Sequence, residues 1–169
     1  MAMNSAGQPV NGTGTPGVIA RPPLLFLAAL LLGFVLDHPL SLPFPVARIG
    51  SLHWISAIIA GSMVLTGIAI FAAGIRNCSS AATPVQGTKP TRTLVTTGIH
   101  GWSRNPIYLG MLLVYGGIGL TVRSPWILIL ALPLAVTIRY GVVAREEAYL
   151  GRRFGDAYRD YKAGVRRWL

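Results

Sequence analysis

The sequence predicts an all-α, polytopic membrane protein with about four transmembrane helices, and three observations support this prediction. Hydrophobic residues make up 52% of the 169-residue chain and charged residues only 12%, about half the charged fraction of a typical soluble domain. The apolar residues form long blocks, as expected of helices that cross a bilayer. Basic residues flank those blocks, where they act as anchors at the membrane surface.

The N-terminal region divides into a tail and a first span. Residues 1–20 are rich in Gly, Pro, Ser, Thr and Asn, which predicts a flexible tail. We expect residues 21–169 to form a single integral membrane domain. The first span, Pro22 to about Asp37, begins with two prolines, which suit the first turn of a helix. It is interpreted as a retained helix and not as a signal peptide. Its uncharged core covers roughly 20 Å, so whether it fully crosses the membrane stays open.

The second span, Ser51 to Ile75, carries no charged residue. A helix of that length measures roughly 37 Å and is long enough to cross a membrane. A polar connector follows at residues 77–104. Loops of this length are usually functional or disordered, so the connector is a candidate part of a site.

The third and fourth spans predict an antiparallel helical hairpin. The third runs from Pro106 to about Val122 and the fourth from Pro125 to about Ala144, with Arg123-Ser124-Pro125 as the tight turn. From Arg145 onward, apolar residues recur at helical spacing and arginines fill the positions between them. This pattern predicts an amphipathic C-terminal helix on anionic lipid.

The positions of the basic residues predict a topology. Residues 76–104, the C-terminal tail and Arg21 together carry twelve Lys and Arg, whereas the opposite connections carry only Arg48 and Arg123. This imbalance places the connector and both termini in the cytoplasm, and we expect a bacterial inner-membrane protein. Arg139 lies inside the fourth span, where a charge either faces a partner or reaches the interface. A nucleic-acid partner is not expected, despite the net charge of +10, because the basic residues do not form one soluble face.

The cysteine content limits the possible chemistry. Cys78 is the single cysteine, which excludes an intrachain disulfide and a multi-cysteine metal site. We expect Cys78 to be a plain loop thiol and expect no metal site.

Polar residues stand at both edges of the predicted hairpin. S-R-N-P-I-Y-L-G opens it and R-E-E closes it, so the topology brings Arg104 and Tyr108 to the same membrane side as Glu146. A glutamate pair also has a simpler interpretation, in which it forms salt bridges with adjacent arginines. Asn105 and Pro106 likewise suit a helix cap and first turn. A capped helix start presents N–H groups that favour an anion.

Several motifs together resemble those of a known enzyme family. V-Q is followed by T-L-V-T-x-G, then by W-x-R-x-P-x-Y-x-G, and finally by E-E with F-G shortly after it. In this order, the motifs resemble those of the isoprenylcysteine carboxyl methyltransferases and of the wider membrane group that includes the phospholipid N-methyltransferases. The resemblance covers residues 84–169, about half of the chain.

The resemblance implies S-adenosylmethionine as the cofactor and methyl donor. It implies a cofactor pocket at the cytoplasmic membrane edge, within residues 84–169, and a hydrophobic or lipid-like acceptor that arrives from the lipid. Glu146, Tyr108 and Arg104 would be the catalytic residues. The residues expected to bind the cofactor are Val85, Gln86, Leu94, Val95, Gly98, His100, Arg104, Asn105, Pro106, Tyr108, Gly110, Glu146 and Glu147.

This chain departs from the family pattern at three positions. Asn105 stands where histidine is usual, and His100 stands where tyrosine is common. His100 either replaces the missing imidazole or is a loop histidine without a role. Val142 stands where the carboxyl methyltransferases have an arginine suited to a substrate carboxylate. Prenylcysteine carboxylate is therefore disfavoured as the acceptor, and a lipid amine, a thiol or another small apolar acceptor stays open.

Two other functional classes stay open at this point. A membrane reductase of the steroid-reductase type would use a comparable helical arrangement with a nicotinamide cofactor. A non-catalytic helical membrane subunit would explain the spans and the basic tail, but not the polar residues on one side.

Overall fold

A computed structural model describes residues 17–40, 42–44, 52–83 and 91–169 of the chain. Within these residues every regular element is helical, so the all-α prediction is confirmed there. The elements are α1 (Pro22–Asp37), α2 (Leu52–Ser80), the short 3-10 turn η2 (Gly98–Gly101), α3 (Pro106–Val122), α4 (Pro125–Thr137), the π-helical stretch η3 (Ile138–Val143), α5 (Ala144–Phe154) and α6 (Asp156–Gly164). The predicted tail falls mostly on residues 1–16, which lie outside the described residues.

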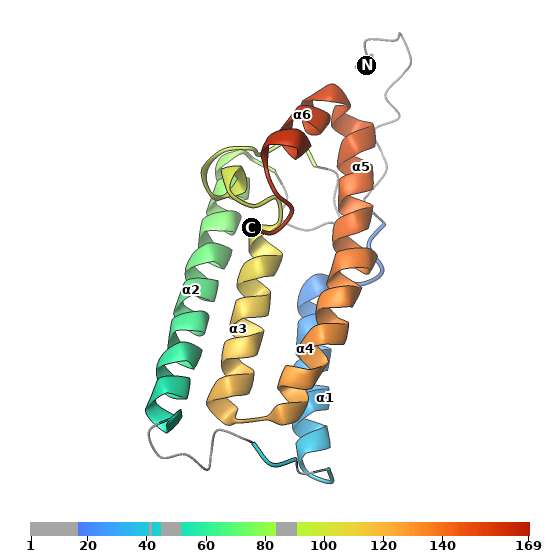
Figure 1. The fold of residues 1–169 in the computed structure, drawn as a ribbon. Helices are drawn as coiled ribbons and strands as arrows, with labels where there is room; N and C mark the ends of the chain where they lie inside the picture. The colour runs from blue at the N-terminus through green and yellow to red at the C-terminus, as the bar shows by residue number, and fades with distance from the viewer. Residues whose placement is uncertain (1–16, 41, 45–51, 84–90) are drawn as a thin grey trace.

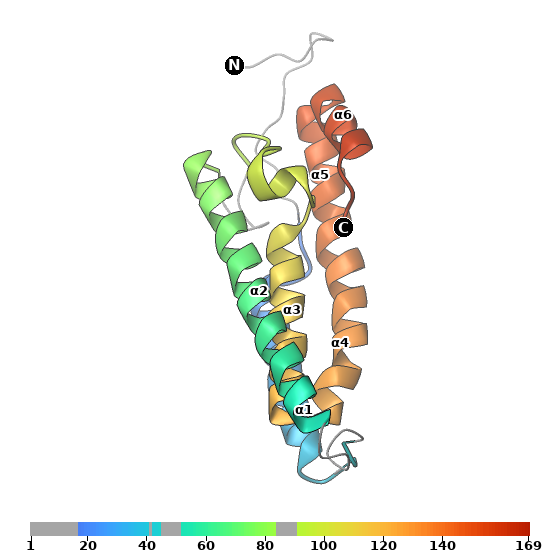
Figure 2. The ribbon, with the colours of Figure 1, turned by 60° about the vertical axis from the view of Figure 1, so that its left-hand side comes forward.

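The long helices stand side by side and form an elongated bundle (Figures 1 and 2). Helix α2 packs along α3, and α1 packs against α4. Helix α5 continues the line of α4 beyond the bundle, and α6 folds over next to it (Figure 1). The bundle therefore has one end that carries the turn between α3 and α4 and the residues after α1, and another that carries η2, α5, α6 and the C-terminal residues.

Glycines let α2 and α3 approach closely. A Cβ atom on Gly110 would lie 2.6 Å from the carbonyl oxygen of Gly67, and one on Gly117 would lie 3.0 Å from that of Ala60. Such contacts leave no room for a side chain, as in many membrane helix pairs. These glycines thus fix the position of α3, whose first turn carries Tyr108.

The turn between α3 and α4 confirms the predicted hairpin. Arg123 ends α3 in the left-handed conformation, and its N–H donates to the carbonyl of Gly119. Ser124 caps α4, because its hydroxyl accepts a hydrogen bond of 3.0 Å from Ile127 N. Pro125 occupies the first turn, where its missing N–H costs little.

Buried apolar side chains form a core where α1, α3, α4 and η3 meet. Ile127, Ile138, Val142 and Val143 have no exposed surface. Most outward faces are apolar as well, and Leu65 and Leu132 are 71% and 73% exposed. Exposed apolar surface on this scale is characteristic of a lipid-facing bundle.

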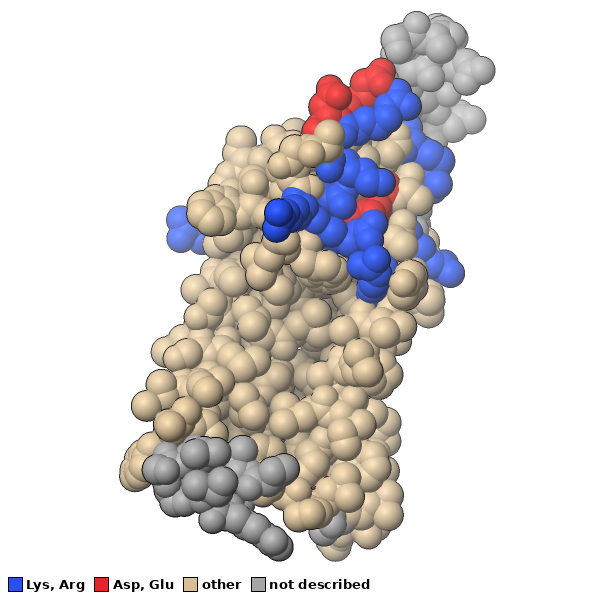
Figure 3. Space-filling model, in the orientation of Figure 1, with Lys and Arg blue, Asp and Glu red and all other residues tan. Residues whose placement is uncertain are grey.

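Two helical segments are long and apolar enough to cross a membrane, Trp54–Ser80 and Pro125–Phe154, whereas Pro22–Asp37 and Pro106–Val122 are shorter. A membrane protein is therefore supported, and the number of four spans stays a prediction. On the face shown in Figure 3, lysines and arginines gather at the end that carries α5 and α6, and the long body of the bundle is uncharged. The orientation of this end toward the cytoplasm stays a prediction.

Three predicted features differ from the structure. Helix α2 continues to Ser80, past the predicted end at Ile75, so Cys78 lies on a helix and is buried and is not a loop thiol. The C-terminal helix is not continuous, because Gly155 adopts φ +53 and separates α5 from α6. Finally, η3 interrupts the regular α-helical pattern of the fourth span.

Candidate functional site

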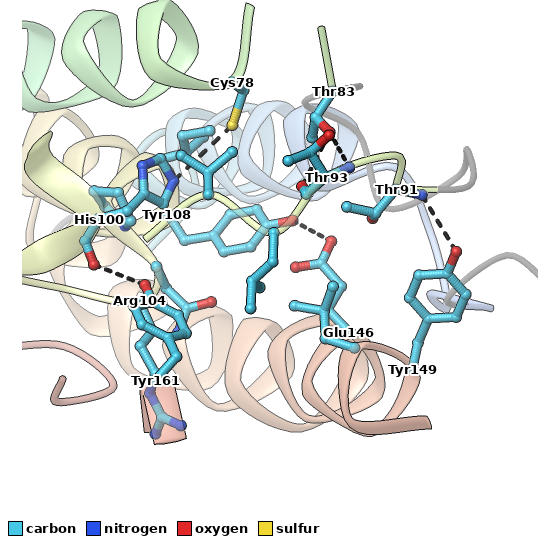
Figure 4. Close-up of a pocket in the computed structure, with 16 residues that line it drawn as sticks. Cys78, Thr83, Thr91, Thr93, His100, Arg104, Tyr108, Glu146, Tyr149 and Tyr161 are labelled. Carbon is cyan, nitrogen blue, oxygen red and sulfur yellow. Dashed lines mark hydrogen bonds between the residues drawn. The ribbon is translucent and has the colours of Figure 1, made fainter. Parts of the chain in front are cut away.

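Tyr108 and Glu146 meet at the end of the bundle where the polar elements gather. Tyr108 lies in the first turn of α3 and Glu146 in the first turn of α5. The phenolic hydroxyl of Tyr108 donates a hydrogen bond of 2.7 Å to Oε1 of Glu146. Both side chains line one pocket (Figure 4). The two edges of the hairpin thus come together, as the sequence predicts.

The pocket contains most of the predicted site residues that the structure describes. Its walls come from the end of α2, the connector after residue 90, η2, the start of α3 and the first turns of α5. The predicted residues that line it are Leu94, Val95, His100, Arg104, Asn105, Pro106, Tyr108 and Glu146.

Five predicted residues are not among those that line the pocket. Val85 and Gln86 lie outside the described residues. Gly98 adopts φ +59 and lies against the side-chain amide of Asn77. Gly110 and Glu147 are placed against other partners, Gly110 against α2 and Glu147 against two arginines.

The two adjacent glutamates have different surroundings. Glu147 accepts hydrogen bonds from Nε and Nη2 of Arg167 at 2.9 and 2.8 Å, and one of its oxygens lies 3.4 Å from Nη2 of Arg104. The salt-bridge interpretation of the pair therefore holds for Glu147, although its partners are distant in sequence. Glu146 points the other way, toward Tyr108, and is the carboxylate that the pocket presents.

The guanidinium of Arg104 is buried and only partly paired. Its side chain is 8% exposed, and Nε and Nη1 have no hydrogen-bond partner among the described residues. Burial raises the pKa of nearby Tyr158 to about 12, an effect that Glu147 strengthens and the Arg104 guanidinium opposes. Unpaired buried N–H groups are costly unless an acceptor arrives. Arg104 is therefore the residue in this site best prepared to bind an anion.

The C-terminal residues hold the start of α3. The backbone N–H of Arg104 donates to the carbonyl of Arg166 at 3.0 Å, and the amide of Asn105 donates to the carbonyl of Arg167 at 3.0 Å. Asn105 occupies the cap position of α3, but its side chain does not cap the helix. Tyr161 of α6 adds a 2.7 Å hydrogen bond to the carbonyl of His100. The chain end thus fixes one wall of the pocket.

His100 and Cys78 form a second polar contact in the pocket. Nε2 of His100 lies 4.0 Å from Sγ of Cys78, and Nδ1 lies 3.5 Å from the amide nitrogen of Asn77. Burial lowers the pKa of His100 from its ordinary value of 6.5, so the ring is neutral near pH 7. In the neutral ring Nδ1 accepts from Asn77 and Nε2 carries the proton, a tautomer assigned from these neighbours.

Threonines and a tyrosine fix the returning connector. The hydroxyl of Thr83 accepts from Thr93 N at 2.8 Å and donates to its carbonyl at 3.1 Å. Tyr149 accepts a hydrogen bond of 3.2 Å from Thr91 N. No motif in the sequence indicates these residues, although Tyr149 lies one helical turn after Glu146 and so shares its face. The lining residues that the sequence does not predict in the site are Cys78, Thr83, Thr91, Thr93, Ile107, Tyr149, Leu150 and Tyr161.

Comparisons with known proteins give one broad match and one short match. The phospholipid methyltransferase family matches residues 55–157, more than half of the chain. A stretch of 27 residues is 67% identical to an uncharacterized protein of Haemophilus influenzae and covers 16% of this chain and 43% of that protein. The chain thus matches less than half the length of that relative. No solved structure matches this chain.

Proposed function

The chain belongs to the phospholipid methyltransferase family, and we propose that it transfers a methyl group from S-adenosylmethionine to a lipid-like acceptor at the cytoplasmic face of the membrane. The observation that carries this proposal is the 2.7 Å contact between Tyr108 and Glu146, in a pocket at the polar end of an apolar bundle. When bound, the donor supplies a methyl group activated by a positively charged sulfur.

The residues of the pocket fit such a donor. Arg104 offers buried, unpaired N–H groups, which suit the carboxylate of the amino-acid end. The N–H groups at the start of α3 favour the same negative charge. Leu94 and Val95 line the pocket as well and supply apolar surface for the adenine.

The polar residues favour an amine as the acceptor. A protonated amine must lose a proton before its nitrogen can attack a methyl carbon. Glu146 is placed to take that proton as a general base, and the hydroxyl of Tyr108 holds its carboxylate in position. Val142 is buried in the apolar core and provides no charge for an acceptor carboxylate. These features support a lipid amine over prenylcysteine.

The pocket also contributes by alignment and by exclusion of water. Methyl transfer is an in-line displacement, so holding the acceptor nitrogen opposite the leaving sulfur lowers the barrier. Tyr108 is 7% exposed and lies between apolar helices. A pocket that excludes water protects the methyl group from hydrolysis and strengthens the interaction of Glu146 with a cation.

Calorimetric titration of the purified protein in detergent tests the donor assignment. We expect saturable binding of S-adenosylmethionine and of S-adenosylhomocysteine. Gly61→Ala is a suitable control, because a Cβ there meets no atom within 4 Å and binding should not change. Folded protein that binds neither compound would contradict the proposal. Binding of a reduced nicotinamide cofactor in their place would support a reductase.

A further inference from the structure

The fourth span contains a π-helical stretch immediately before the site. Within Ile138–Val143 each backbone hydrogen bond spans one more residue than in an α-helix. The N–H of Ala144, for example, donates to the carbonyl of Arg139, five residues earlier. A regular α-helix uses the residue four positions earlier. Such stretches are rare, and they are frequent at functional sites. Ile138, Val142 and Val143 have no exposed surface, so one side of this stretch lies in the core.

The π-helical stretch changes which residue faces the pocket. Each residue of an α-helix advances by about 100°, and seven residues make nearly two turns. In an unbroken α-helix, Arg145 would therefore lie on the same face as buried Ile138. The wider turn delays the rotation by about one residue. As a result Arg145 is exposed, and Glu146 meets Tyr108.

Residues before α1 cover this stretch and hold Arg145 away from the pocket. The N–H of Ile19 donates to the carbonyl of Gly141 at 3.3 Å. A Cβ atom on Gly141 would lie 2.7 Å from Cδ1 of Ile19, so the side chain of Ile19 packs directly against the backbone of Gly141. The guanidinium of Arg145 donates to the carbonyl of Gly17 at 2.9 Å.

We propose that the π-helical stretch Ile138–Val143 is a positioning element that places Glu146, and not Arg145, in the site. The two side chains are adjacent and oppositely charged, so the choice decides the chemistry of the pocket. An arginine there would repel a cationic acceptor and would have no site to accept its proton. The role of Glu146 in catalysis rests on the proposed function, whereas the helical register does not.

Insertion of one alanine after Tyr140 tests the proposal through activity. Tyr140 is 62% exposed, so the added residue enters on the outer side of the helix. The wider turn accommodates one extra residue, so a second one moves Arg145 to the position that Glu146 holds. We therefore expect kcat to fall on the order of 100-fold, as for loss of a general base. Adding the exchange Arg145→Glu with Glu146→Arg to the insertion should restore at least a tenth of the lost rate. The same exchange in the chain without the insertion should inactivate it.

Thiol labelling tests the register without any measurement of activity. In a Cys78→Ser background, Arg145→Cys should react with a small methanethiosulfonate reagent at least tenfold faster than Glu146→Cys, and the order should reverse when the alanine insertion is also present and the protein folds. Equal rates in the chain without the insertion, or faster reaction at 146, would overturn the proposal. So would a folded insertion variant of normal activity, or an exchange that restores nothing in the insertion variant. If labelling gives the expected order but no variant, wild type included, transfers methyl groups, the proposed function fails and the register stands.

Discussion

Oη of Tyr108 lies 2.7 Å from Oε1 of Glu146, and this hydrogen bond joins the first turn of α3 to the first turn of α5. The two residues are 38 positions apart in sequence, and two features of the structure bring them together. The glycines of α2 and α3 fix the position of Tyr108, and the π-helical stretch fixes the rotation of Glu146. Each contribution is open to a separate test.

Removing the hydroxyl of Tyr108 tests the hydrogen bond itself. We expect Tyr108→Phe to lower kcat roughly tenfold, since a hydrogen bond to a charged group is worth about 1.5 kcal/mol or more. The ring stays in place, so donor affinity measured by calorimetry should be unchanged. A variant with normal kcat would show that Tyr108 does not orient the carboxylate during turnover.

The buried imidazole of His100 predicts a pH dependence of stability. Burial lowers the pKa of His100 below 6.5, so the unfolded chain binds more protons at this residue than the folded protein does. The stabilisation is thus complete above about pH 6.5 and is lost as pH falls through the lower folded pKa. Between pH 7 and pH 5, the Tm in detergent should fall further for wild type than for His100→Gln. Parallel curves for the two proteins would contradict this.

The paired contact between Arg167 and Glu147 predicts a loss of stability when its geometry changes. Arg167 donates to both carboxylate oxygens, which the single ammonium of lysine does not reproduce. We expect Arg167→Lys to cost about 1 kcal/mol, the net value of one hydrogen bond. The control is Arg166→Lys, because Arg166 contacts Arg104 through its backbone carbonyl. Equal thermal denaturation of the two variants would argue against this role for the pair.

A comparison of two glycines separates helix packing from cofactor binding. Gly110→Ala places a Cβ 2.6 Å from the carbonyl oxygen of Gly67, and such overpacking costs about 1–3 kcal/mol. Gly61→Ala meets nothing within 4 Å and should not destabilise the protein. We expect a lower Tm for Gly110→Ala alone, with unchanged donor affinity in the folded protein. Weaker donor binding without a loss of Tm would instead place Gly110 in the cofactor site.

The sequence predicts the hairpin because its limits carry local signals. Pro106 and Pro125 begin helices, Ser124 caps one, and the apolar blocks 106–122 and 125–144 contain no charge other than Arg139. The convergence of Tyr108 and Glu146 follows from that hairpin, because an antiparallel pair returns to the membrane side from which it started. Residues placed by topology alone are therefore accessible to sequence analysis.

Other features of the site depend on contacts that leave no local pattern. The bond from Asn105 to the carbonyl of Arg167 joins residues 62 positions apart, and no spacing rule indicates it. The sequence predicts a loop at Cys78 because Arg76 resembles the end of the second span, whereas the helix continues to Ser80 and η2 packs against it. The π-helical stretch is hidden for a similar reason, since nothing in I-R-Y-G-V-V distinguishes a π-helical turn from the α-helical turns of an apolar span.

Methyl transfer from radiolabelled S-adenosylmethionine into an extracted membrane lipid fraction tests the central claim most directly. Wild-type protein should label a lipid amine, and Glu146→Ala should label at most about 1% as much, the loss expected without the general base, while it keeps its Tm and helical signal. Label found on a thiol would retain the methyltransferase and change the acceptor. Absence of any labelled product with folded wild-type protein, or full activity in Glu146→Ala, would contradict the account.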